Sequence, residues 1–171
     1  MSTNTKNLCR SALLAAVSFV FLWLASALPT MKLALMLIAS LGAAVLCMSC
    51  SWKWALGAYA VTAALALLLL PTKSAALLYS AFFGFYPIWK LFAERQSRSV
   101  LRWGMKLALF NAALIVLTLF ASSLLGLPRV EGAGLVILGL LGANAVFLVY
   151  DYALNICMLY YIRKIAGRWI K

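Results

Sequence analysis

One acidic residue inside a long apolar segment is the feature of this sequence best placed to do chemistry. Asp151 lies in an apolar segment that runs from about residue 134 to 161. Along a helix it would sit roughly 18 Å from Arg163, at about 1.5 Å per residue, which is near the middle of a bilayer. A carboxylate there is costly unless it is paired, protonated or facing water. We therefore interpret Asp151 as a candidate solute or proton site, and as the only ionisable side chain deep in the membrane.

The helical neighbours of Asp151 are also polar. Asn144, Asp151 and Asn155 fall on one narrow face at about 100° per residue. We predict that this polar stripe looks inward and contributes donors and acceptors to a substrate-binding site. The alternative is that these side chains only join helices, through hydrogen bonds worth about 0.6 kcal/mol each.

An aromatic segment is the second candidate for chemistry. Tyr79, Phe83, Tyr86 and Lys90 share a helical face. Their rings could stack on a flat heterocycle or cover a small apolar solute, so we predict Tyr79, Phe83 and Tyr86 as substrate-binding residues. The alternative is that they fill the core or form an interfacial belt. Pro87 removes one backbone hydrogen bond here and is expected to kink the helix.

Residue types limit the other possibilities. The chain has no histidine, and its three acidic residues are Glu94, Glu131 and Asp151. Catalytic triads, carboxylate pairs and catalytic metal sites need residues that are scarce here, so we expect no enzyme, no metal and no cofactor. The net charge of +12 suits anionic lipid headgroups. No basic segment is longer than a loop, which argues against nucleic acid.

The elements that must position these residues are membrane spans. Hydrophobic residues make up 67% of the chain, and a helix needs about 20 mostly apolar residues to cross a bilayer. We predict an all-α fold: one integral membrane domain over residues 1–171, a compact six-helix bundle with short loops. The predicted spans are about 11–28, 33–50, 54–70, 74–92, 107–127 and 134–161.

The distribution of Lys and Arg predicts the orientation of the bundle. With six spans, twelve of the fifteen basic residues fall on the side of the two termini and three on the other side. Because basic residues stay on the cytoplasmic side, we expect both termini in the cytoplasm. The basic segment 90–106 is expected to be a long cytoplasmic connection.

Small residues recur in the first span. Ala12 and Ala16 are four residues apart near its cytoplasmic end, a spacing that lets another helix approach closely. Together with six short spans, termini on one side and almost no soluble part, this pattern resembles the substrate-binding S components of energy-coupling-factor vitamin transporters.

The resemblance carries several implications. It implies a bacterial cell-membrane protein whose Ala12 and Ala16 meet a transmembrane coupling subunit that works with ATPases. It also implies a solute toward the outer half of helices four to six. The chain departs from that family in two features: the link at 29–32 is much shorter than the gating loop usual there, and no vitamin-specific signature is present.

The sequence leaves three functional readings. The first is a small-solute binding or transport subunit that works with energy-supplying partners, since the chain has no nucleotide motif. The second is a proton-coupled carrier in which Asp151 titrates. The third is a scaffold that does not transport and that recruits cytoplasmic partners through its basic 90–106 loop.

Overall fold

A computed structural model of the chain describes residues 3–124 and 133–166. Every regular element in this part of the chain is a helix. The elements in order are α1 (Thr3–Ala27), the 3₁₀ turn η1 (Pro29–Met31), α2 (Lys32–Ser49), α3 (Trp52–Leu69), α4 (Lys73–Leu78), the π-helical η2 (Tyr79–Phe83), α5 (Tyr86–Glu94), α6 (Ser99–Leu124), α7 (Ala133–Tyr161) and the π-helical η3 (Ile162–Ala166).

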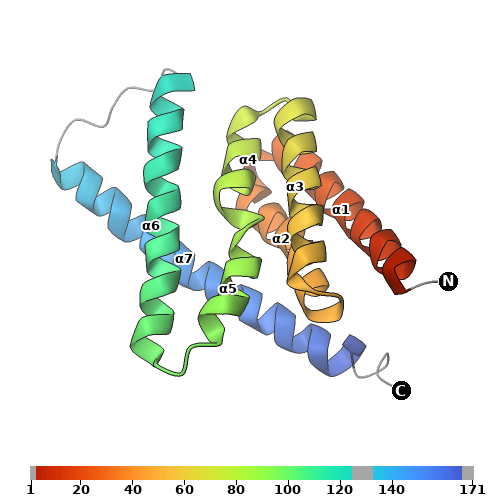
Figure 1. The fold of residues 1–171 in the computed structure, drawn as a ribbon. Coiled ribbons are helices and arrows are strands. Elements are labelled where there is room, and N and C mark those ends of the chain that lie inside the picture. Colours follow the sequence, from red (N-terminus) through yellow and green to blue (C-terminus); the bar gives the residue numbers. More distant parts are fainter. Residues whose placement is uncertain (1–2, 125–132, 167–171) are drawn as a thin grey trace.

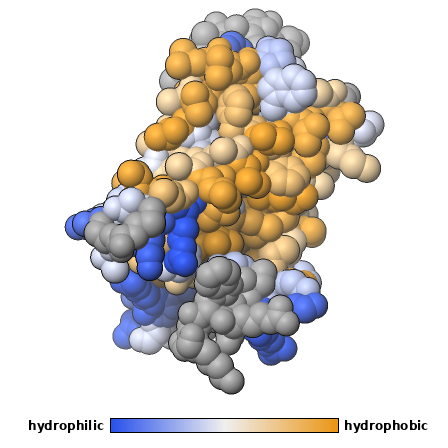
Figure 2. All heavy atoms as spheres, turned by 90° about the vertical axis from the view of Figure 1, so that its right-hand side faces the viewer, coloured by the Kyte–Doolittle hydropathy of each residue, from blue (hydrophilic) through white to orange (hydrophobic). Residues whose placement is uncertain are grey.

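The described helices form six segments that are long and apolar enough to cross a membrane, with α4, η2 and α5 together making the fourth. Large apolar side chains such as Leu68, Leu138 and Val149 are strongly exposed. Figure 2 shows that apolar residues cover much of one face, while hydrophilic residues gather mainly at one end. An apolar surface this broad is unusual on a soluble protein and is expected where lipid is the solvent. These features indicate a multi-pass membrane protein, as the composition predicted.

The first three long helices and α4 form one side of the molecule, and α6 lies on the other (Figure 1). Helix α7 crosses the molecule diagonally, and its last turns lie on the same side of this view as the start of α1. The tight contact of α1 with α2 depends on Gly42, because a Cβ there would lie 2.3 Å from the Ser18 Oγ. That hydroxyl donates a hydrogen bond to the Ala39 carbonyl oxygen at 2.8 Å, which links the two helices.

The fourth segment is interrupted, as Pro87 predicted. The Gly84 N–H bonds to the Tyr79 carbonyl oxygen, five residues back, which marks a π-helical turn. A new helix then starts at Tyr86, with Pro87 in its first turn, where a missing N–H does no harm.

Predicted span boundaries differ from the helix boundaries at three places. α1 begins at Thr3 and not near residue 11. We expected spans near 74–92 and 107–127 joined by a loop at 90–106, but α5 continues to Glu94 and α6 already starts at Ser99. Only residues 95–98 connect them. Of the basic residues that suggested a loop, Lys90, Arg102 and Lys106 are helical. Lys90 and Lys106 are also buried, for the reason given below. The predicted end of the fifth span, at about residue 127, lies outside the described residues.

Candidate functional site

Asp151 does not stand alone in the apolar interior. Its carboxylate is 2% exposed and accepts bonds from two lysines and a tyrosine. The Lys90 ammonium lies 2.5 Å from Oδ1 and also donates to the Asp151 carbonyl oxygen at 3.0 Å. The Tyr86 hydroxyl donates to Oδ1 at 2.5 Å, and the Lys106 ammonium donates to Oδ2 at 3.1 Å. The carboxylate is thus paired on both of its oxygens.

Glu94 completes the charge balance at the edge of this group. Its Oε1 lies 3.3 Å from the Lys106 ammonium and 3.8 Å from that of Lys90. Its side chain is 41% exposed, whereas Lys90 and Lys106 are 0% and 4% exposed. Two ammonium groups therefore face two carboxylates. We call Lys90, Glu94, Lys106 and Asp151 the ion cluster; its formal net charge is zero, which is what a low-dielectric interior requires.

Helical spacing explains how three helices bring these groups together. Tyr86, Lys90 and Glu94 follow one another at four-residue intervals on α5, so their side chains lie along one face. The short connection 95–98 returns the chain so that Lys106 of α6 faces the same group. Asp151 of α7 then closes the arrangement, and the ion cluster joins α5, α6 and α7.

The prediction that Asp151 is the only deeply placed ionisable residue was wrong. Lys90 and Lys106 had been assigned to a loop, yet they are among the most buried polar side chains described. Lys90 lies one turn from the end of α5 and Lys106 two turns into α6. Asp151 therefore lies toward the end of the bundle where α5 ends and α6 begins, instead of at its middle. The signal was present in the sequence: Lys90 shares the face of Tyr86, and a buried acid needs a cation.

The aromatic side chains that were predicted to bind substrate pack against other protein side chains. Tyr79, Phe83 and Tyr86 are all buried. Phe83 meets Tyr150 of α7 edge-on, with ring centroids 5.0 Å apart. Phe82 was not among the predicted substrate-binding residues, but its ring packs against several aromatic rings of α5, α6 and α7. Its neighbours are Phe83, Tyr86, Phe110, Phe147 and Tyr150.

The two asparagines of the polar stripe have different surroundings. Asn144 and Asn111 of α6 lie within hydrogen-bond range of each other, with amide N···O distances of 3.4 and 3.5 Å. This contact between α6 and α7 agrees with the alternative interpretation of the polar stripe, in which its side chains join helices through hydrogen bonds. Asn155 lies one turn beyond Asp151 on α7 and is half-buried. The structure therefore joins Asp151 with Tyr86, but puts Asn144 at a separate contact.

The small residues of α1 divide between two faces. Ser11, Ala15 and Ser18 are buried against the bundle, whereas Ala12 and Ala16 are exposed. The predicted partner-coupling pair is therefore on the outer surface, free to meet lipid or another helix.

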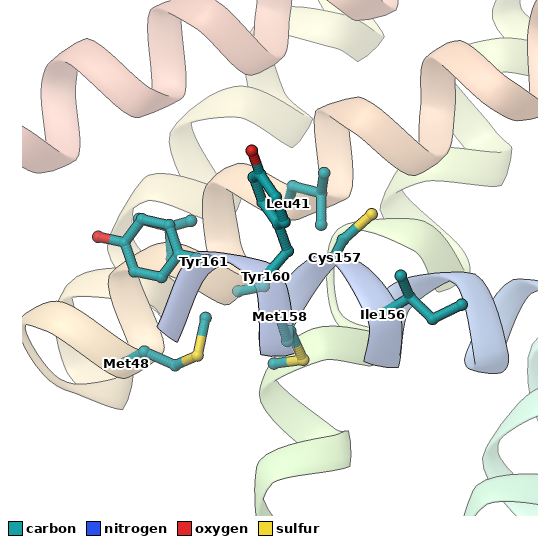
Figure 3. A pocket seen from close by; sticks show the side chains of 9 residues that line it. Leu41, Met48, Ile156, Cys157, Met158, Tyr160 and Tyr161 are labelled. Atoms are coloured by element: carbon teal, nitrogen blue, oxygen red, sulfur yellow. The ribbon is translucent and has the colours of Figure 1, made fainter. Parts of the chain in front are cut away.

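An apolar cavity of about 340 Å³ lies between α2 and α7. It extends beyond Asp151 toward the end of α7, and Met158, two turns along from Asp151, contributes to it. In Figure 3, Met48 and Tyr161 lie at one end of the cavity, and Tyr160 lies beside Leu41. No sequence pattern predicts this site, because its residues are ordinary apolar side chains on two helices far apart in the chain. The lining residues are Leu41, Ala44, Val45, Met48, Ile156, Cys157, Met158, Tyr160 and Tyr161.

The chain shows no significant match to any protein-family model, to any curated protein or to any solved structure.

Proposed function

We propose that this chain is a small-solute binding or transport subunit of the cell membrane that works with partner proteins. The observation that carries the proposal is the apolar cavity between α2 and α7. Its volume of about 340 Å³ falls in the range of small-molecule sites, roughly 300–1,000 Å³. Its lining is almost entirely apolar side chains from α2 and α7, as in most small-molecule sites.

The ion cluster supports this site because it fixes the position of α7, which forms one wall of the cavity. Asp151 is fixed by Lys90 and Lys106 from two other helices, and α7 runs on from Asp151 to the part of the helix that lines the cavity, which begins at Ile156. Half-buried Asn155 lies between the two and is the nearest predicted polar ligand for a solute. In this proposal the ion cluster positions α7 and the solute contacts the cavity.

The distribution of charge supports an orientation with both termini in the cytoplasm. Lys53, Arg95 and Arg98 are exposed and lie at the junctions of α2 with α3 and of α5 with α6, at the end of the bundle where α1 begins and α7 ends. Among the described residues, omitting the two buried lysines of the ion cluster leaves eight basic residues on this side and two on the other. The positive-inside rule then places this side in the cytoplasm.

The coupling partner would meet α1. The exposed Ala12 and Ala16 form a smooth surface on which a second helix can pack closely. The chain has no nucleotide-binding motif, so energy for transport would come from that partner.

The direct test is native mass spectrometry of the protein purified from its own membranes. We expect the wild type to carry a bound molecule. Ala44→Phe, which adds a ring at a buried position in the cavity wall, should lose it. Leu148→Phe on the exposed surface of α7 is the matched control and should keep it. Equal occupancy in all three proteins would contradict the cavity as the binding site.

A proton-coupled carrier is the second candidate, and one observation favours it. Asp151, Lys106 and Glu94 form a continuous polar chain, with links of 3.1 and 3.3 Å, from the interior to an exposed carboxylate. Uptake that stops when the proton gradient is collapsed, while ATP remains available, would support this candidate over the first.

A further inference from the structure

The apolar cavity opens among exposed apolar residues. Ile156, Leu159 and Tyr160 of α7 are each at least half exposed, and two of them line the cavity. In a membrane protein such a surface faces lipid, because apolar side chains of this size cover the bilayer-facing side. An occupant would therefore enter sideways from the bilayer.

Cations follow the cavity directly along the chain. Arg163 and Lys164 of η3 are exposed, and they come two and three residues after the cavity residue Tyr161. The Lys164 ammonium lies over the Tyr160 ring, 5.2 Å from its centroid. Of the three acidic residues in the chain, Glu94 and Asp151 are engaged with lysines of the ion cluster. Among the described residues, no acidic side chain therefore remains to pair with Arg163 or Lys164.

The order of these groups matches that of an anionic lipid. The apolar cavity corresponds to the acyl chain of such a lipid. Tyr160 and Tyr161 correspond to its interfacial region, and the two cations correspond to its phosphate. Resting on the proposed solute-binding role of the cavity, we infer that its occupant is an anionic phospholipid with one acyl chain between α2 and α7 and its phosphate against Arg163 and Lys164. The charge complementarity of this end favours it over a neutral lipid.

Cys157 provides a reporter inside the cavity. It is a free, half-buried thiol among the lining residues. With Cys9, Cys47 and Cys50 replaced by alanine, the rate of its alkylation by N-ethylmaleimide measures whether the cavity is open. The probe lipids are phosphatidylglycerol and phosphatidylcholine with identical acyl chains, added to delipidated protein in detergent micelles.

We expect phosphatidylglycerol to slow alkylation about tenfold at a concentration about ten times its dissociation constant, from simple mass action. Phosphatidylcholine at the same concentration should protect much less. Arg163→Gln with Lys164→Gln should remove the difference between the two lipids. A control protein with all four native cysteines replaced and Leu148→Cys, outside the cavity, should show no difference between lipids.

Two results separate this inference from the proposed function. Equal protection by both lipids in the otherwise unaltered protein would overturn the anionic-lipid assignment. If Ala44→Phe, or Val45→Phe should the first variant not fold, also displaces a co-purified molecule that is not a lipid, the solute-binding role stands and this inference fails. If cavity filling displaces nothing and neither lipid protects Cys157, both fail.

Discussion

Asp151 carries a charge that the surrounding apolar helices could not accommodate by itself. Lys90 and Lys106 stabilise the Asp151 carboxylate, and their ammonium groups are as deeply buried as the carboxylate itself. Such a pair adds little net stability compared with apolar residues of the same size, but removing one partner leaves the others uncompensated. The sequence alone predicts that Asp151→Asn stabilises the bundle or leaves it unaffected if Asp151 has only a structural role. The lysines reverse that expectation.

Asp151→Asn should therefore destabilise the protein by about 3–5 kcal/mol, because two buried ammonium groups lose their main counter-charge. The free energy of unfolding in detergent micelles measures this. Lys90→Met combined with Asp151→Asn should cost less than the sum of the two single changes, since the pair acts as a unit. A stable Asp151→Asn protein would mean that the ion cluster is not formed.

Glu94→Gln is the matched change at the exposed edge of the ion cluster. Because the Glu94 side chain is 41% exposed, solvent screens its charge, and the loss should stay below about 1 kcal/mol. The same unfolding measurement compares the two variants. A loss as large as that of Asp151→Asn would show that Glu94 is buried in the membrane-bound protein.

At the scale of elements, the packing of α1 on α2 depends on one missing side chain. A Cβ on Gly42 would meet the Ser18 Oγ at 2.3 Å and the Leu14 carbonyl oxygen at 3.3 Å. Gly42→Ala should therefore destabilise the bundle by about 1–3 kcal/mol through overpacking. Ser18→Ala in the same protein should recover part of the loss.

Gly139 of α7 is the control, since a Cβ there meets nothing within 4 Å. Gly139→Ala should be neutral or stabilising by up to about 1 kcal/mol, from helix propensity alone. Thermal unfolding of the three variants side by side checks both changes. Equal effects of Gly42→Ala and Gly139→Ala would show that α1 and α2 are not in close contact at this point.

The outer face of α1 can be tested separately from its packing. Ala12→Trp and Ala16→Trp lie on the exposed face, so each should fold normally while losing co-purification of a partner from native membranes. Ala15→Trp, on the buried face, should fail to fold. If partner association is unchanged in both outer variants, the small residues face only lipid.

The helices were predictable from the sequence to different degrees. Apolar length located six spans, and Pro87 located the break in the fourth. The start of α6 was misplaced because Lys106 was interpreted as a loop residue, although its charge is satisfied inside the bundle. Local patterns do not reveal such long-range pairing. Helical spacing singled out Tyr79, Phe83 and Tyr86, which are all buried, but spacing could not show that their rings pack against protein side chains. Their contact with a solute stays a prediction.

At the scale of the whole molecule, the proposed orientation predicts which connections are reachable from outside the cell. Thr30 and Ser97 are both exposed and lie at opposite ends of the bundle, in the connection after α1 and in that between α5 and α6. In a protein without native cysteines, a membrane-impermeant maleimide on intact cells should label Thr30→Cys and spare Ser97→Cys. The reverse labelling pattern would invert the bundle and contradict the cytoplasmic termini.

The central claim is that the bundle holds a solute between α2 and α7. A crystal structure of the protein purified from its own membranes tests this most directly, because each residue that lines the cavity is known and density beside it can be located. The account predicts elongated density alongside Ala44 and Cys157 that ends near Tyr160 and Tyr161, and that is absent from Ala44→Phe. A cavity closed by its own side chains, with the ion cluster intact and no density between the two helices, would contradict it.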